Sequence, residues 1–241
     1  MRRGLALLLT LVLLAPFLYM LWGARFAASL PAGLGFWLAN SVVIAVLAAS
    51  SQVFTSAAAA YAFARLRFPA RGTVFGAMIA LLLVPGIMLL FPRLTIVTAL
   101  GAVNTHAGLV STGLVSAWGI LLLHHVFRRL PHDVEDAARL DGAGEWTILW
   151  RIVVPRATPA LIAVAALAFV DQWKNLIWPL VVAPSGVTPV VELGLATLAR
   201  AAPTNWSVMA TAVITSVPAV VVVLLAQRAT LTAMGRALSP P

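Results

Sequence analysis

The sequence predicts an all-α membrane protein with about six transmembrane helices and a cytoplasmic two-helix loop between helices four and five. Of its 241 residues, 62% are apolar and 10% are charged, whereas soluble domains carry about 25% charged residues. Long stretches without Asp, Glu, Lys or Arg recur along the chain, and five of the seven acidic residues fall between positions 133 and 145. These observations exclude a soluble globule and set one polar segment apart from an apolar chain.

The uncharged stretches predict the membrane spans, because a helix needs about 20 apolar residues to cross the hydrocarbon core. The six expected helices cover about 4–23, 37–63, 73–91, 107–127, 158–182 and 206–227. The first could instead be a signal peptide, but its apolar run exceeds the 7–15 residues of a signal-peptide core, which favours a retained helix. Pro85-Gly86 in the third helix and Pro218 in the sixth predict kinks or local unwinding.

The arginines predict the orientation. With the N-terminus in the cytoplasm, twelve of the fifteen arginines fall on cytoplasmic segments and three on the opposite side. Cytoplasmic loops carry such an excess, so both termini and the acidic segment are expected in the cytoplasm. The formal charge of +9 is explained by this arrangement, and no nucleic-acid partner is expected. The absence of cysteine excludes a disulfide framework, thiol catalysis and cysteine-bound zinc.

The acidic segment predicts a first short helix. Pro131 and Asp133 indicate a helix start with Asp133 as the N-cap. Glu135 and Asp136 then lie in the first turn, where the helix dipole favours negative charge. Gly142 stands where a left-handed residue would end the helix.

A second short helix should begin near Gly144 or Glu145 and stop at Pro155. Its expected apolar side carries Trp146, Leu149, Ile152 and Val153. On the first helix, one face with small residues carries Val134, Ala137, Ala138 and Asp141, flanked by Leu140. Small side chains let another protein approach the backbone closely, so this pair of helices is expected to insert into a groove of a partner.

The same segment resembles the coupling loop of permease subunits of bacterial ABC importers. Their pattern is Glu-Ala-Ala, three residues, Gly, nine residues, Ile, one residue, Leu-Pro. Every spacing is kept here in Asp136-Ala137-Ala138, Gly142, Ile152 and Val154-Pro155, with Asp for Glu and Val for Leu. Three further stretches resemble the carbohydrate-uptake, maltose-permease-like branch: Asn40–Gly72, Phe169–Leu180 and Asn205–Arg228. The resemblance covers roughly residues 36–236.

This resemblance implies an organisation and a set of partners. Residues 1–35 would form the first transmembrane helix and a short outer loop, and residues 36–241 the permease core with its coupling loop at 128–157. A dimeric cytoplasmic ATPase would grip the loop, and a second homologous permease subunit would complete the pore. An extracytoplasmic solute-binding protein would meet the outer segments around 24–36 and 183–205. The expected ATPase-coupling residues are Asp136, Ala137, Ala138, Leu140, Asp141, Gly142, Ile152 and Pro155.

The chain is expected to be a non-catalytic transport subunit. A P-loop needs Gly-x-x-x-x-Gly-Lys-Ser/Thr, and the single lysine, Lys174, stands in Gln172-Trp173-Lys174-Asn175. ATP and Mg²⁺ would therefore be used by the partner ATPase, and no cofactor or metal site is expected in this chain. The implied location is the bacterial inner membrane, and the implied solute is a sugar or a sugar phosphate.

The expected substrate path lies in the fifth helix, because ionisable groups at membrane depth usually face a cavity. Lys174 could favour an anionic or heavily hydroxylated solute, or it could simply pair with Asp171, three residues away. Two tryptophans could form an aromatic platform for a sugar or belong to the interfacial belt. The candidate residues are Asp171, Trp173, Lys174, Asn175 and Trp178.

Other functions remain open at this point. Within the same family, the last helix also resembles permeases for glycerol-3-phosphate and its diesters. An ion-coupled secondary transporter would need more buried acids than Asp171 alone. A membrane enzyme would need acids clustered at a membrane face, whereas the spacing of the five loop acids suits helix capping better.

Overall fold

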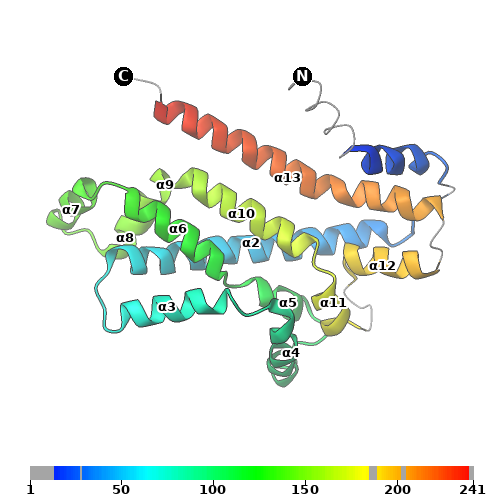
Figure 1. The fold of residues 1–241 in the computed structure, drawn as a ribbon, viewed down its shortest axis with the longest axis horizontal. Coiled ribbons are helices and arrows are strands. Elements are labelled where there is room, and N and C mark those ends of the chain that lie inside the picture. Colours follow the sequence, from blue (N-terminus) through cyan, green and yellow to red (C-terminus); the bar gives the residue numbers. More distant parts are fainter. Residues whose placement is uncertain (1–13, 28, 185–188, 202–204, 239–241) are drawn as a thin grey trace.

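The computed structural model describes residues 14–27, 29–184, 189–201 and 205–238, and every regular element among them is helical. The long helices α2, α6, α10 and α13 run along one elongated bundle (Figure 1). Short helices gather at its two ends, with α7 and α8 at one end and α11 and α12 toward the other (Figure 1). The predicted all-α class is confirmed for the described residues.

Helix α2 (Leu34–Arg65) is the central element. It packs against α6 (Ala117–Arg129) and α10 (Thr158–Trp173), and α10 in turn packs against α13 (Trp206–Leu238). The buried side of α2 consists largely of small residues, which let neighbouring helices approach closely. They include Ser41, Ala45, Ala48, Ala49, Ser56, Ala57 and Ala60.

The length of α2 matters for the functional site. Its 32 residues extend about 48 Å at 1.5 Å per residue, whereas the hydrocarbon core is about 30 Å thick. The one charged residue of α2, Arg65, lies in its last turn. The C-terminal end of α2 is therefore the end that projects beyond the apolar layer.

The third predicted span is sharply broken. Helix α3 (Arg71–Leu81) is followed by the 3₁₀ turn η1 (Gly86–Leu89) and α4 (Leu90–Ala99), with a bend of 102° between the two halves. Pro85 has no N–H to donate and disfavours a helical conformation in the residue before it. The break predicted at Pro85-Gly86 is confirmed, and α4 leaves the direction of the bundle (Figure 1).

The fourth predicted span, 107–127, is also broken, at a place with no proline. Helix α5 (His106–Val110) and η2 (Ser111–Gly113) precede α6 with a bend of 44°. At the break, the carbonyl of Leu114 accepts hydrogen bonds from the hydroxyls of Ser51 and Thr55 on α2, each at 3.0 Å. A continuous helix was expected here, and the hydroxyls of the neighbouring helix satisfy the freed backbone group.

The prediction of a single helix over the fifth span, 158–182, is wrong. Helix α10 ends at Trp173, and α11 (Ile177–Val182) begins after a gap of three residues. The side-chain oxygen of Asn175 accepts the backbone N–H of Trp178 at 3.2 Å. Such a local bond offers the backbone an alternative to continuing the helix.

A helix was not predicted at α12 (Val191–Ala201). It is tied to the N-terminal half of α2, because the Val191 N–H donates to the Ser41 hydroxyl at 2.9 Å. The side-chain amide of Asn40 donates to the carbonyl of Pro189 at 3.0 Å just before the helix. These bonds fix α12 at the end of the bundle opposite α7.

The sixth predicted span, 206–227, lies within α13, which runs without interruption through Pro218. The prediction of local unwinding at Pro218 is therefore wrong. Beside the start of α13, a helix over Leu14–Ala24 brings Trp22 within 6.0 Å of Trp206, ring centre to ring centre. This helix confirms the end of the predicted first span, whose residues before Leu14 lie outside the described residues.

Among the described residues, two unbroken helices are long and apolar enough to cross a membrane, α2 and residues 206–231 of α13. The number rises to five when each of three bent helix pairs is taken as one span. The sequence prediction of about six spans also counted the N-terminal segment, of which the described residues form a shorter apolar helix, Leu14–Ala24. Of the three bent pairs, only the one within 107–127 was predicted as one straight helix, because hydropathy does not detect where a helix breaks.

The close contact between η2 and α2 gives a testable prediction. A methyl group on Gly113 would lie 2.5 Å from Cβ of Ala48, so Gly113→Ala should cost about 1–3 kcal/mol through overpacking. For a chain of this size that lowers Tm by several degrees, at about 2–4 °C per kcal/mol. Thermal unfolding in detergent would measure it. Gly76→Ala is the matched control because nothing lies within 4 Å of its added methyl; equal Tm values for the two variants would contradict the packing.

Candidate functional site

The polar loop 128–157 folds into two short helical arms with a glycine corner. The first arm is α7 (Asp133–Leu140), and the second comprises α8 (Glu145–Ile148), the π-helical turn η3 (Leu149–Val153) and α9 (Val154–Arg156). Gly142 has φ +84°. Its N–H bonds the carbonyl of Arg139, and the N–H of Ala143 bonds that of Ala138, at 3.0 and 2.9 Å. This is the Schellman motif, so the predicted left-handed corner at Gly142 is confirmed.

Two details of the arms differ from the prediction. Asp133 is the first helical residue and not the N-cap, which is His132 and makes no side-chain cap. The second arm does not stop at Pro155 but passes through it to Arg156. A π turn precedes the proline, where the Val154 N–H bonds the carbonyl of Leu149 five residues back. The arm then meets α10 at a bend of 86°.

The second arm is seated on the bundle by apolar contacts. Ile148, Leu149 and Val153 are buried in one cluster with residues of α2 and α6, including Tyr61 and Phe127. The prediction for Leu149 and Val153 is confirmed, and Ile152 packs at the edge of the cluster. The prediction that Trp146 lies on the buried apolar side of this arm is wrong, because Trp146 is 58% exposed. Ile148, two positions along, is fully buried instead.

The first arm is held by a buried ion pair with α2. The side chains of Arg65 and Glu135 are 2% and 1% exposed. The Nε atom of Arg65 lies 2.9 Å from Oε2 of Glu135, and Nη2 lies 2.8 Å from Oε1, so the contact is bidentate. Nη2 also donates to the carbonyl of Leu130 at 3.0 Å, and Nη1 lies 3.3 Å from Nε2 of His132. Buried charges require such multiple partners.

A second set of charged contacts joins the two arms to each other and to α2. Arg139 donates from Nε to Oε1 of Glu145 at 2.9 Å and from Nη1 to Oδ1 of Asp136 at 2.8 Å. The Tyr61 hydroxyl donates to Oε2 of Glu145. The Arg139 guanidinium lowers the pKa of the Glu145 carboxyl through these hydrogen bonds, and Glu145 raises the pKa of Arg139 in turn. Arg139 thus bridges the corner, and both arms are linked to the end of α2.

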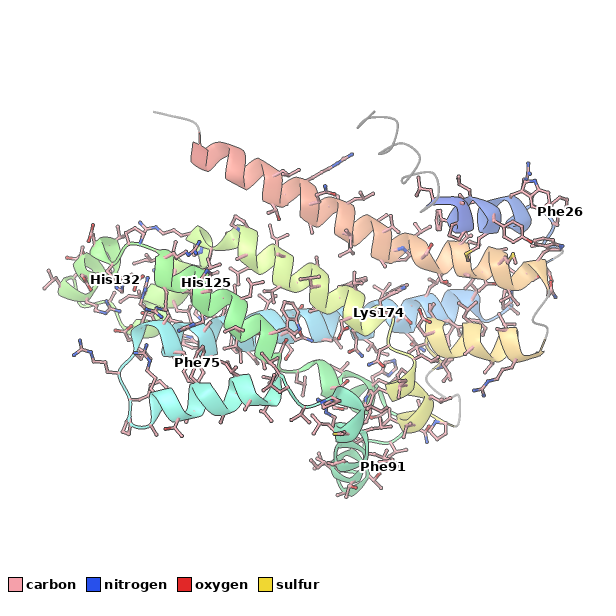
Figure 2. All side chains as sticks on the ribbon, viewed as in Figure 1. Phe26, Phe75, Phe91, His125, His132 and Lys174 are labelled. Carbon is pink, nitrogen blue, oxygen red and sulfur yellow. The ribbon has the colours of Figure 1, made fainter. Side chains whose placement is uncertain are left out.

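These anchoring residues were missed as a site by the sequence analysis, which placed Glu135 in a favourable first turn and named no partner for it. A signal was present. Tyr61 and Arg65 are four residues apart on α2, and Glu135 and Arg139 are four apart on α7, so each pair shares a helix face. Figure 2 shows His132 near one end of the bundle, with Lys174 farther along it.

The opposite face of α7 points away from the bundle. Leu140 is 90% exposed, and Val134, Asp136 and Ala137 are exposed as well. Of the residues predicted to couple to an ATPase, five lie together on this side: Asp136, Ala137, Leu140, Asp141 and Gly142. Ala138 and Ile152 are half-buried against the bundle, and Pro155 is exposed on the other arm. The loop therefore presents a small exposed face that includes the apolar side chains of Val134 and Leu140.

Of the residues predicted for a substrate path, the structure exposes two and buries two others. Asp171 and Lys174 are exposed and paired, with Nζ 3.7 Å from Oδ1. Trp173 and Trp178 are buried, and their indole N–H groups donate to the carbonyls of Thr215 and Gly108 at 3.0 and 2.9 Å. Asn175 accepts from the Trp178 backbone. The two tryptophans connect helices in this conformation and offer no open ring face to a sugar, and contact of any of the five with a solute stays a prediction.

Comparison with known proteins identifies the family. The family described as binding-protein-dependent transport system inner membrane component matches residues 52–234, a range that includes both arms of the loop. The chain belongs to this family. It is therefore a permease component of a membrane transport system, as the sequence analysis predicted from the loop motif.

Relatives of known designation agree with this membership of the inner membrane component family. The chain is 32% identical to the sn-glycerol-3-phosphate transport system permease protein UgpE of Yersinia pestis over 80% of its own length and 70% of the relative's. It is 31% identical to the lactose transport system permease protein LacG of Rhizobium radiobacter, covering 85% of this chain and 75% of LacG. It is 31% identical to the arabinooligosaccharides transport system permease protein AraQ of Halalkalibacterium halodurans, covering 80% of this chain and 69% of AraQ.

A solved structure shares the fold. A chain of a bacterial ABC transporter involved in the import of the acidic polysaccharide alginate superposes with a TM-score of 0.78 at 21% identity, covering 94% of each chain. The predicted permease fold is confirmed by this match.

The buried ion pair generates a second prediction. Glu135→Ala leaves Arg65 buried without a counter-ion, which should cost about 3–5 kcal/mol of local stability. We expect faster hydrogen exchange at the backbone amides of 133–153, read by mass spectrometry on the full chain. Asp133→Ala, an exposed acid in the same helical turn, is the control. The double variant Arg65→Met with Glu135→Met should recover much of the protection, because it removes both charges. Equally slow hydrogen exchange in Glu135→Ala and in Asp133→Ala would contradict the anchoring role of the Arg65–Glu135 pair.

Proposed function

We propose that the chain is the transmembrane subunit of an ATP-driven importer, and that the exposed face of α7 is the surface on which a separate ATPase acts. The observation that carries the proposal is the contrast between the two sides of the loop. One side is fixed to α2 by buried charges, and the other exposes Leu140 with small neighbours. A helix whose inner side is fixed and whose outer side is exposed is suited to bind in a groove of a partner protein.

The mounting explains how force would reach the membrane. A push on α7 is resisted by the Arg65–Glu135 pair and by Arg139, which link α7 to the end of α2. Helix α2 contacts α6 and α10 along its length, so displacement of the loop moves the central helices together. Alternating access of this kind is a rigid-body change driven by a partner.

The remaining partners follow from the family. No P-loop occurs in the sequence, so the ATPase is a separate chain, acting as a dimer with its own ATP and Mg²⁺. A second permease subunit would line the path, and a solute-binding protein would dock at the opposite end, near α12. The twelve-to-three arginine distribution supports a cytoplasmic loop and cytoplasmic termini in the bacterial inner membrane.

We propose a sugar or sugar-like solute, supported by the designations of the lactose and arabinooligosaccharide relatives. Glycerol-3-phosphate is the second candidate. A specific observation supports it, since the chain is 32% identical to the UgpE protein of Yersinia pestis, whose designation names this solute.

The test uses the complete assembly in proteoliposomes. ATP is supplied on the side of the membrane that carries the ATPase, and lactose, arabinooligosaccharide or sn-glycerol 3-phosphate is supplied on the other side as the solute. Leu140→Asp should reduce ATP-dependent uptake more than about tenfold, because a buried leucine contributes about 1.5–3 kcal/mol to an interface and a buried charge opposes it. The fold should persist because Leu140 is 90% exposed. Thr73→Asp, which adds the same charge in the first turn of α3 at the same end of the bundle, should leave uptake unchanged. Undiminished ATP-dependent uptake by the Leu140→Asp assembly would refute the docking surface.

A further inference from the structure

Three of the helix breaks converge on one hollow. A cavity of about 200 Å³ lies where η1 and α4, η2, and the gap between α10 and α11 come together. Its polar lining comes from one residue of each part: Arg93 of α4, Thr112 of η2 and Asn175 of the gap. Discontinuous helices in transporters commonly surround solute sites, because unwound backbone is tolerated only where it lines a cavity or is buried in protein.

The polar groups at this hollow are donors. The side-chain oxygen of Asn175 is used by the Trp178 backbone N–H, so its NH₂ group is the part left to bind a ligand. The Thr112 hydroxyl is buried without a hydrogen-bond partner among the described residues. Trp178 also lines the hollow, but its indole N–H is taken by the carbonyl of Gly108. Because the Thr112 oxygen lies beneath the surface of the hollow, the donors that a ligand in the hollow meets are those of Arg93 and Asn175.

Charge decides which ligand fits. Among the described residues, Arg93 has no ion-pair partner, and no acidic residue lines the hollow. Lys174, which the sequence analysis offered as one candidate for an anionic solute, is offset by Asp171 at 3.7 Å and does not line the hollow. An unpaired guanidinium with neighbouring neutral donors matches a phosphate or carboxylate, which accept several hydrogen bonds at once.

We infer that this hollow, formed by Arg93, Thr112 and Asn175, is a subsite for the anionic group of a solute carrying a phosphate or carboxylate. At about 200 Å³ it is smaller than the 300–1,000 Å³ typical of whole ligand sites, so it holds one end of the solute. The role in transport rests on the proposed function, whereas the binding of an anion by this chain does not.

The chain has no cysteine, which allows a direct binding test on the purified full chain in detergent. Ile87→Cys places a thiol on the lining of the hollow, at a position that is 58% exposed. Its alkylation by a maleimide is timed with sn-glycerol 3-phosphate, glycerol, glucuronate or glucose present. We expect the two anions to slow alkylation at about one tenth of the concentration that glycerol and glucose require, because charged hydrogen bonds contribute roughly 1.4 kcal/mol or more, a factor of ten in affinity.

Second-site variants identify the cation. Arg93→Gln in the Ile87→Cys background should abolish protection, and Arg93→Lys should retain part of it. Arg200→Gln, which removes an exposed arginine on α12, should retain protection in full. Leu140→Cys reports any general effect of the solutes on thiol reactivity, since it lies at the other end of the bundle.

The inference is overturned by equal protection from anions and neutral solutes, by no protection from any of the four, or by full protection in Arg93→Gln. Protection by added phosphatidylglycerol with none from the soluble anions would assign the hollow to a lipid headgroup and would also overturn it. The uptake assay above is independent of this readout. An anion-binding chain that fails to couple to ATP would refute the proposed function alone, and a coupled transporter without anion protection would refute the subsite alone.

Discussion

The buried ion pair between Arg65 and Glu135 is the contact on which the arrangement of the polar loop depends. Each charge is almost fully removed from water, and each would be costly to bury alone. The bidentate geometry and the additional carbonyl of Leu130 fix the guanidinium in one orientation. Because Arg65 ends α2 and Glu135 lies in the first turn of α7, the central helix and the most acidic helix are joined at one point.

The contacts around this pair extend its effect to the whole loop. Arg139 holds the two arms together across the Gly142 corner, and Ile148, Leu149 and Val153 seat the second arm in the apolar cluster. Such fixation leaves the outer face of α7 free for a partner. The π turn before Pro155 allows the second arm to continue into the 86° bend toward α10, so the loop is connected rigidly at both of its ends.

The other end of the bundle is built differently. There the helices are interrupted, and hydroxyl, amide and indole groups satisfy the freed backbone. Ser51 and Thr55 bind the carbonyl of Leu114, and Trp178 binds that of Gly108. These interruptions create a polar-lined hollow inside an apolar protein. A bundle that is stiff at the loop and broken near the hollow suits a device that is moved at one end and changes shape around a solute at the other.

The sequence by itself determined the class, the approximate spans and the two-armed loop. Hydropathy, arginine distribution and the spacing from Asp136 to Pro155 are local properties, and Gly142 needs only its own backbone to end a helix. The break at Pro85 was predictable for the same reason, since proline acts on its own chain. The tertiary structure alone decided that Glu135 is buried while Leu140 is exposed, that Trp146 gives way to Ile148 in the core, and that Leu114 ends a helix without a proline. Each of these depends on which distant side chain faces the residue, as Arg65 faces Glu135 and Ser51 faces Leu114. Sequence spacing shows which residues share a helix face but not which distant residues that face meets.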